Sequence, residues 1–175
     1  MRRVIHANGF TLLEVLIALL VFSLGLMGLA GLLVVSVQTN HSAYLRTQAS
    51  FLAQTMADRM RANILGVWNA KYVNTYGASS LGNSTTCLPP AYCSYAQIAT
   101  RDGMVWSNQL VSFLPNPTAT IACPAPATIP SADNLTKLPP YSGQCTITIQ
   151  WAESTLDRTS GTGTTPETLA WVFQP

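Results

Sequence analysis

The stretch that decides the fold is Gly9-Phe10-Thr11-Leu12-Leu13-Glu14-Val15, together with the uncharged run that follows it as far as Val37. Nearly every residue from Phe10 to Val37 is apolar or small. A helix over this run, at about 1.5 Å per residue, is roughly 42 Å long and can cross a bilayer. We therefore predict a membrane segment.

Glu14 is the single charged residue inside this segment. A carboxylate in hydrocarbon costs about 2.5–3.5 kcal/mol on insertion scales, so Glu14 should have a partner or a function. Two ordinary interpretations fit worse. A secretory signal peptide has a shorter apolar region followed by a small-residue cleavage site, whereas here Gly9 precedes a long run. A plain signal anchor leaves the acid unexplained.

The segment from Gly9 to Val15, after a leader that contains Arg2 and Arg3, resembles the type IV prepilin signature. The resemblance implies that prepilin peptidase cleaves between Gly9 and Phe10 and that Phe10 is then N-methylated. It also implies a partner for Glu14, namely the new amino terminus of a neighbouring subunit in a growing filament. The residue before the glycine departs from the pattern, because many family members have Lys or Arg there and this chain has Asn8.

The chain divides into four predicted parts: a leader at 1–9, the transmembrane or filament-core half of a helix at 10–37, its amphipathic half at 38–66, and a globular domain at 67–175. No proline interrupts the helix from Phe10 to Ile64. Its second half carries an apolar face with helical spacing, formed by Leu45, Ala49, Leu52, Met56, Met60 and Ile64. Met56 and Met60 are expected to fill a core rather than bind a metal.

Three glycines recur every third residue in the apolar half, at Gly25, Gly28 and Gly31. Close packing between membrane helices through small residues is one interpretation. The other is a deliberately weak stretch of helix, because each glycine costs roughly 1 kcal/mol relative to alanine in an aqueous helix. The sequence leaves both open.

Charge and cysteine content place the bulk of the chain outside the cytoplasm. Beyond Val37 there are seven Lys or Arg against six Asp or Glu, too even a balance to hold nucleic acid by counterion release. The four cysteines favour an oxidising compartment, and the leader arginines fit a cytoplasmic amino terminus. We predict a single-pass inner-membrane protein with a periplasmic domain before assembly, and an extracellular pilus location after it.

The predicted helix ends in Asp58-Arg59-Met60-Arg61-Ala62-Asn63, with cations near its carboxyl end. As charge patterning this is only a solvated helix end. The run is also similar to the Asp-Arg-Met-Arg-Ala-Asn run of the minor pilins called PilV, the type IV pilus modification proteins. A second predicted helix, Tyr95 to Phe113, has Ser94 as N-cap and stops before Pro115, and this arrangement after Cys93 extends the resemblance.

The rest of the domain contains strands and loops. Alternation predicts strands at Thr118–Cys123, Cys145–Trp151 and Thr168–Phe173, whereas Trp68–Pro90 and the proline-rich Pro124–Pro140 are expected to be loops. The three strands should form a small antiparallel sheet against the amphipathic half of the long helix. The fold class is therefore α+β, and the resemblance implies the type IV pilin fold.

The four cysteines allow three connectivities, and their spacing does not suit a zinc site. We predict that Cys123 pairs with Cys145, because these residues lie at the ends of two candidate neighbouring strands. Cys87 should then pair with Cys93 in a short loop ahead of the second helix. No metal, cofactor or catalytic residue is predicted, since the only histidines, His6 and His41, cannot join a Ser, His and acid set.

Two functions remain. The first is a minor pilin, a non-enzymatic subunit of the type IV pilus that supports assembly or priming, adhesion and twitching motility. Its partners would be prepilin peptidase, other major and minor pilins, the inner membrane and the pilus assembly machinery. The second is a type II secretion pseudopilin or a membrane-anchored periplasmic binding protein. The run from Gly9 to Glu14 does not separate the two.

Overall fold

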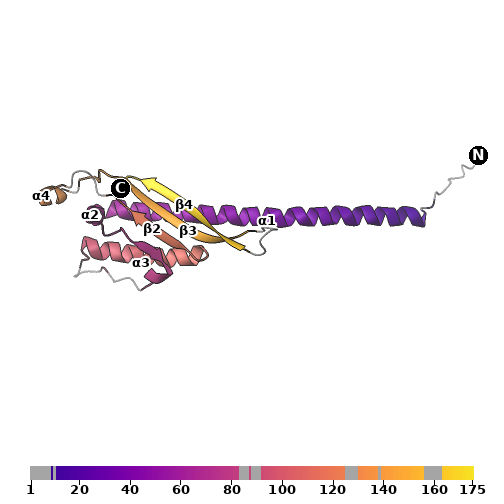
Figure 1. Cartoon of the computed structure of the whole chain (residues 1–175), viewed down its shortest axis with the longest axis horizontal. Helices are drawn as coiled ribbons and strands as arrows, with labels where there is room; N and C mark the ends of the chain where they lie inside the picture. The colour runs from indigo at the N-terminus through magenta and orange to yellow at the C-terminus, as the bar shows by residue number, and fades with distance from the viewer. Residues whose placement is uncertain are drawn as a thin grey trace, which may run out of the picture. The chain divides into compact units, whose positions relative to one another are not determined.

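The computed structural model describes residues 9, 11–82, 87, 92–124, 130–137, 139–155 and 163–175. The chain forms two compact units, residues 1–42 and 43–175, whose boundary falls inside the first helix. Figure 1 labels the helices and strands. In chain order they are α1 (Leu12–Ala62), α2 (Ile64–Trp68), β1 (Thr75–Gly77), the 3-10 turn η1 (Ala78–Ser80), α3 (Tyr95–Phe113), β2 (Thr118–Ala122), α4 (Ala132–Leu135), β3 (Cys145–Thr155) and β4 (Gly163–Phe173).

The long helix α1 ends at Ala62, inside the range 38–66 predicted for its amphipathic half, because Asn63 leaves the helical conformation. Asn63 has φ −125° and ψ 60°, and its side-chain amide donates to the Tyr95 carbonyl and the Tyr72 hydroxyl. These side-chain hydrogen bonds stabilise the non-helical conformation of Asn63, in competition with the backbone bonds that would continue the helix. The chain turns here and enters the short helix α2.

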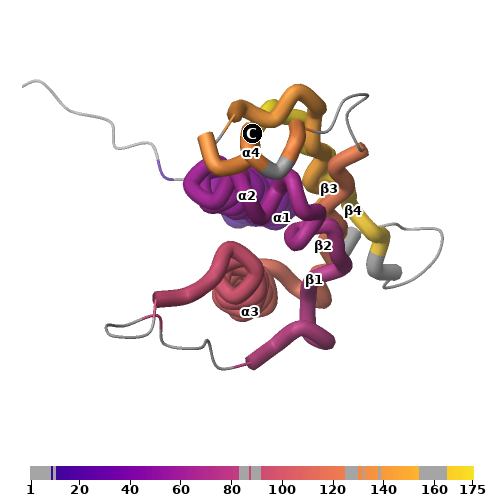
Figure 2. Tube along the Cα trace, turned by 90° about the vertical axis from the view of Figure 1, so that its left-hand side faces the viewer, coloured from indigo at the N-terminus to yellow at the C-terminus, as the bar shows by residue number. Residues whose placement is uncertain are grey.

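The second unit has one hydrophobic core between its helices and its sheet. The sheet order is β1-β2-β3-β4 with every pair antiparallel, and Figure 2 shows α1 and α3 along the same side of it. As predicted, Leu52, Met56 and Met60 are buried in this core. Trp106 of α3 is fully buried, and its Nε1 donates to the Leu52 carbonyl at 2.9 Å, which ties α3 to α1.

The sheet has one strand more than predicted. β1 lies within the segment expected to be a loop, and it is only three residues long. Its last residue, Gly77, has φ +147°, and a Cβ there would approach the Pro117 carbonyl oxygen to 2.7 Å. A side chain would therefore be both strained and obstructed at Gly77. β3 and β4 also run beyond their predicted ranges, to Thr155 and from Gly163.

Helix α3 has the bounds that the sequence predicts. Ser94 and Gln97 form a reciprocal capping box at its start. Gly103 of α3 has a packing role, because a Cβ there would lie 2.5 Å from Cε1 of Tyr76. The glycine lets α3 approach β1 closely. The predicted loop Pro124–Pro140 is wrong in one respect, since its described part contains α4.

Two disulfides join Cys123 to Cys145 and Cys87 to Cys93. Cys145 begins β3 and is fully buried, and Cys123 directly follows β2, so the first bond closes the long connection between two paired strands. The second bond spans six positions ahead of α3.

Removal of the Cys123–Cys145 bond by serine substitution at both positions should lower the free energy of unfolding by about 3 kcal/mol, because the bond spans 22 positions. Serine at Cys87 and Cys93 should cost less, about 2 kcal/mol, since that loop is shorter. Urea unfolding followed by tryptophan fluorescence measures both. Non-reducing peptide mapping that joined Cys93 to Cys123 would contradict this pairing.

Candidate functional site

The amino-terminal segment begins at an unobstructed glycine. Gly9 is exposed, and a Cβ built on it would meet no described atom within 4 Å. Packing inside the chain therefore gives no reason for a glycine here. A glycine lets another molecule approach the backbone closely, as a peptidase must. Phe10, the residue expected to be methylated, lies outside the described residues.

Thr11 caps the first turn of α1. The Glu14 backbone N–H donates to the Thr11 hydroxyl at 3.3 Å and to the Thr11 carbonyl at 3.1 Å. This is the bond that an N-cap threonine makes, and it satisfies one of the free N–H groups at a helix start. Glu14 thus occupies the first turn, where a negative side chain suits the helix dipole.

The Glu14 carboxylate has no hydrogen-bond or ion-pair partner among the described residues. It borders an apolar hollow of about 520 Å³ on the helix surface, lined by Val15, Ala18, Leu19 and Phe22. Ala18 lies one turn beyond Glu14, and its small side chain leaves room there. A group from outside the chain can therefore reach the carboxylate.

The helix surface around Glu14 is apolar and uncovered. From Leu12 to Val35 every residue is exposed within this unit, Leu12 at 91% and Met27 at 76%. In the described part of the chain, α1 is the one helix long and apolar enough to span a membrane, and an 18-residue window within it has a mean hydropathy of 2.5. So large an exposed apolar surface requires lipid or other helices around it.

Two hydroxyl groups in this part of α1 are already satisfied within the helix. Ser23 donates to the Leu20 carbonyl at 2.8 Å, and Thr39 donates to the Val35 carbonyl at 2.9 Å. A hydroxyl bonded to its own helix carries little desolvation cost in an apolar environment. Glu14 is the one charged side chain of this apolar run, and it still needs a partner.

The three glycines of this run touch no other described part of the chain. A Cβ at Gly25, Gly28 or Gly31 would meet no described atom within 4 Å outside the local helix backbone. Packing within the subunit thus explains none of them. Both interpretations of the sequence, contact with other helices and a weak stretch of helix, remain.

The end of α1 in the second unit carries one exposed ion pair and one largely buried ion pair. Asp58 and Arg61 form an exposed ion pair at 2.9 Å, which contributes little to stability. Arg59 instead turns inward and pairs with Asp102 of α3 at 3.1 Å, with the Asp102 side chain only 9% exposed. Within the run, Asp58, Arg61 and Ala62 are exposed, whereas Met60 and Asn63 are buried and Arg59 is partly buried.

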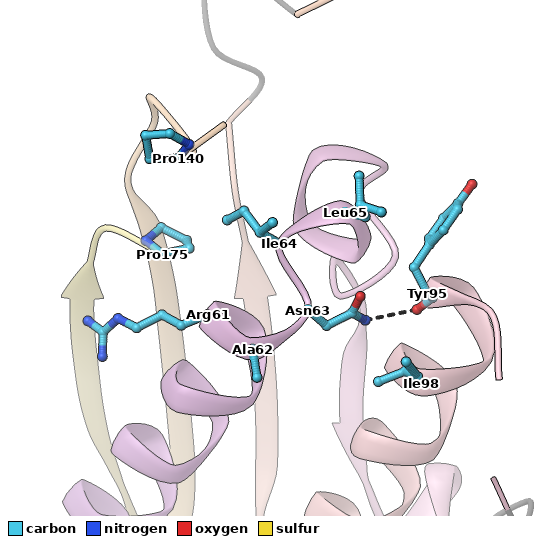
Figure 3. A pocket seen from close by; sticks show the side chains of 9 residues that line it. All are labelled: Arg61, Ala62, Asn63, Ile64, Leu65, Tyr95, Ile98, Pro140 and Pro175. Atoms are coloured by element: carbon cyan, nitrogen blue, oxygen red, sulfur yellow. Dashed lines mark hydrogen bonds between the residues drawn. The ribbon is translucent and has the colours of Figure 1, made fainter. Parts of the chain in front are cut away.

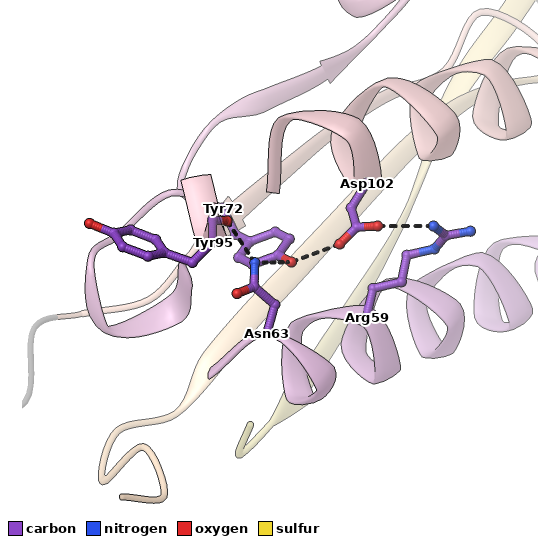
Figure 4. Close-up of polar contacts among 5 residues, drawn as sticks. All are labelled: Arg59, Asn63, Tyr72, Tyr95 and Asp102. Carbon is purple, nitrogen blue, oxygen red and sulfur yellow. Dashed lines mark hydrogen bonds and ion pairs between the residues drawn. The ribbon is translucent and has the colours of Figure 1, made fainter. Parts of the chain in front are cut away.

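Asp102 is the centre of a buried polar cluster that joins α1, α3 and the segment before β1 (Figure 4). Its Oδ1 accepts from Arg59, and its Oδ2 accepts from the Tyr72 hydroxyl at 2.8 Å. The Tyr72 hydroxyl in turn accepts from Asn63 at 3.0 Å. Sequence reasoning missed Asp102 and Tyr72, since an isolated acid or tyrosine carries no periodic signal.

Burial keeps the tyrosines of this cluster protonated. Desolvation raises the pKa of Tyr76 to about 12, with the nearby Asp102 charge acting in the same direction. The pKa of Tyr72 is raised further, again chiefly by burial. Both hydroxyls therefore remain neutral donors, and Tyr76 uses its own to reach the Tyr72 carbonyl at 2.8 Å. The hydrogen bonds of the cluster hold α1, α3 and the segment before β1 together.

A hollow of about 590 Å³ lies beside this cluster, where α1, α2 and α3 meet (Figure 3). Ile64, Leu65 and Ile98 supply apolar side chains to its lining, and Arg61 supplies a charge. No acid, base and nucleophile converge among its lining residues. Within the described ranges, no group of three or more His, Cys, Asp or Glu could hold a metal ion.

The fold and the amino-terminal segment together define a class of protein. An amino-terminal helix whose second half packs on a small antiparallel four-stranded sheet is the α+β architecture of type IV pilins, and the predicted fold class is confirmed. Residues 31–104 match the family model described as Type IV pilin Tt1218, and residues 6–30 match the Prokaryotic N-terminal methylation motif.

The chain is thus similar to type IV pilins, a family of structural subunits, and its matched motif includes Gly9, Phe10 and Glu14. The motif implies prepilin processing followed by incorporation into a pilus. No curated protein and no solved structure matches the chain. The narrower assignment to PilV stays a prediction.

Proposed function

We propose that this chain is a minor pilin of the PilV-like group, a structural subunit that supports type IV pilus assembly or priming, adhesion and twitching motility. One observation carries the proposal: Glu14 stands without a described partner on an exposed apolar helix, inside a segment that matches the methylation motif. A membrane anchor alone has no use for such an acid.

Processing is the first step of the proposed function. Prepilin peptidase cleaves between Gly9 and Phe10, and the new amine of Phe10 is methylated. Cleavage creates a positively charged terminus next to an apolar helix. That terminus is a cation that can pair with Glu14 of a neighbouring subunit.

Docking is the second step. Before assembly the subunit is a single-pass inner-membrane protein with its globular unit in the periplasm. The methylated amine of one subunit pairs with the Glu14 carboxylate of the next, which lowers the cost of both charges in an apolar environment and sets the subunits in register. Major and minor pilins and the assembly machinery are the partners, and the pilus is the final location.

The buried part of the Asp58 to Asn63 run supports membership of the PilV-like group. Arg59 and Asn63 both belong to the Asp102 cluster. A protein with the same residue types at these positions could therefore make the same contacts between the end of α1 and α3. These contacts give a physical reason for the same run to be present in other proteins whose long helix ends in this way.

Replacement of Gly9 by valine should block processing, because a branched side chain crowds the backbone that the peptidase must reach. Full-length protein should then accumulate in the inner membrane, with at least a tenfold loss of the processed form on an immunoblot. Leu13→Val is the matched control, since Leu13 lies on the same segment and is exposed at 69%. Normal processing of Gly9→Val would argue for a membrane-anchored periplasmic binding protein instead.

A further inference from the structure

The two disulfides of the globular unit differ in how far their cysteines are covered. Cys145 is fully buried, and Cys123, although partly exposed, packs against the hydrophobic core. Cys87 and Cys93 are both partly exposed. A reducing thiolate has to approach a sulfur atom directly before it can break the bond. In the folded chain, the Cys87–Cys93 bond is therefore open to a reductant from both of its cysteines.

The backbone holds Cys123 and Cys145 together independently of their disulfide. β2 and β3 are paired directly beside the bond, with Ala122 opposite Thr146. The chain after Cys123 is tied down as well, because the Pro124 carbonyl accepts from the Tyr141 hydroxyl at 2.8 Å. Two thiols held side by side in this way have a high effective concentration. Reduction of this bond is therefore readily reversed.

Cys87 and Cys93 have less support of this kind. Cys87 lies outside the helices and strands, and Cys93 comes directly before Ser94, the N-cap of α3. No strand pairing in the described ranges aligns the two residues. The effective concentration of their thiols after reduction is therefore lower than that of the Cys123 and Cys145 thiols.

The positions of Cys93 and Cys145 also make them unequal leaving groups. A thiolate that attacks the Cys87 sulfur displaces Cys93 as a thiolate at the amino-terminal end of the 19-residue helix α3, where a negative charge is stabilised. An attack on the Cys123 sulfur displaces Cys145 as a thiolate in a fully buried position. A charge in that environment is costly.

We propose that the Cys87–Cys93 disulfide is redox-sensitive: a dithiol reductant of the thioredoxin class opens it in the folded protein, while Cys123–Cys145 stays oxidised. One thiolate of the reductant attacks the Cys87 sulfur, forms a mixed disulfide and releases Cys93 as a thiolate. The second thiol of the reductant then attacks the reductant's sulfur in the mixed disulfide and releases Cys87. The reductant is thereby oxidised by two electrons to a disulfide, and its two thiol protons end on Cys87 and Cys93.

The contacts on either side of this bond involve neither of its cysteines. The capping box at the start of α3 forms without them, and the Tyr95 carbonyl accepts from Asn63 at 2.8 Å. On the other side, the Gly82 carbonyl accepts from Asn108 of α3 at 3.2 Å. Opening of the bond therefore leaves α3 attached to the rest of the globular unit.

The test is a redox titration of the purified full-length protein in detergent, in mixtures of reduced and oxidised dithiothreitol. Thiols are trapped with N-ethylmaleimide and each cysteine is scored by peptide mapping. Cys87–Cys93 should be half reduced at a ratio of reduced to oxidised reagent at least tenfold lower than Cys123–Cys145. Tryptophan fluorescence should not change while only the first bond is open.

The same titration in urea is the matched control. The difference between the bonds should vanish or reverse there, because burial and strand pairing are lost and the shorter loop, which spans six positions rather than 22, closes more easily. Equal half-reduction ratios in the folded protein, prior reduction of Cys123–Cys145, or an undiminished difference in urea would each overturn the proposal.

A trapped intermediate tests the direction of attack. A thioredoxin whose second active-site cysteine is replaced by serine should be recovered on Cys87 at least tenfold more often than on Cys93. Recovery mainly on Cys93, or unfolding on opening of the Cys87–Cys93 bond alone, would contradict the proposed route. Processing after Gly9 involves neither disulfide, so the proposed function is tested separately from this result.

Discussion

Glu14→Ala is expected to remove this protein from sheared pili while leaving it in the inner membrane and cleaved after Gly9. Loss of the carboxylate removes an insertion cost of about 2.5–3.5 kcal/mol, so insertion should be at least as efficient. Docking should fail, because the methylated amine of the neighbouring subunit loses its counter-ion. A tenfold or greater drop in the ratio of pilus to membrane protein is the expected result, measured by quantitative immunoblot of both fractions.

Ser23→Ala is the matched control for Glu14→Ala. It also removes a polar group from the apolar half of α1, but the Ser23 hydroxyl is bonded to its own helix at Leu20. Its recovery in pili should equal that of wild type. If Glu14→Ala were recovered in pili as well as Ser23→Ala, Glu14 would have no part in docking, and the case for a pilin would lose its main physical support.

Asp102→Ala is expected to destabilise the globular unit by about 3 kcal/mol. The change leaves the Arg59 guanidinium in a largely buried position without its anion, and removal of one partner of a buried ion pair typically costs 3–5 kcal/mol. It also leaves the Tyr72 hydroxyl without an acceptor. The low end of the range applies because the Arg59 side chain is 28% exposed. Urea unfolding measures the change.

Two further variants distinguish the effect of breaking the buried Arg59–Asp102 ion pair from the effect of losing a negative charge. Asp58→Ala breaks the exposed pair with Arg61 and should cost less than about 1 kcal/mol. The double variant Asp102→Leu with Arg59→Met should regain part of the loss, since an apolar pair can replace a buried ionic one. Equal effects of Asp58→Ala and Asp102→Ala would contradict the role given to Asp102.

Regular elements of this fold can be predicted from the sequence because their signals are local. The apolar face at Leu52 and Met56 follows the helical period, and the cap at Ser94 with the stop before Pro115 bounds α3. Strict alternation marks β3, where Cys145, Ile147 and Ile149 are buried. The motif from Gly9 to Glu14 is equally local, so the processing segment needs no structure to be recognised.

Other features depend on contacts far apart in the chain. β1 has only three residues, and pairing with β2, about 40 positions later, makes it a strand. Asp102 is 43 positions from Arg59 and 30 from Tyr72, so no spacing in the sequence links them. The early end of α1 also depends on such partners, because Asn63 bonds Tyr72 and Tyr95 rather than continuing the helix.

The most direct test of the central claim, that this chain is a processed pilin subunit, is mass spectrometry of the amino-terminal peptide of the protein recovered from sheared pili. The proposed function predicts a peptide that begins at Phe10 and carries one added methyl group on its amine. Recovery of the protein only from membranes, with an amino-terminal peptide that still contains Asn8 and Gly9, would contradict it.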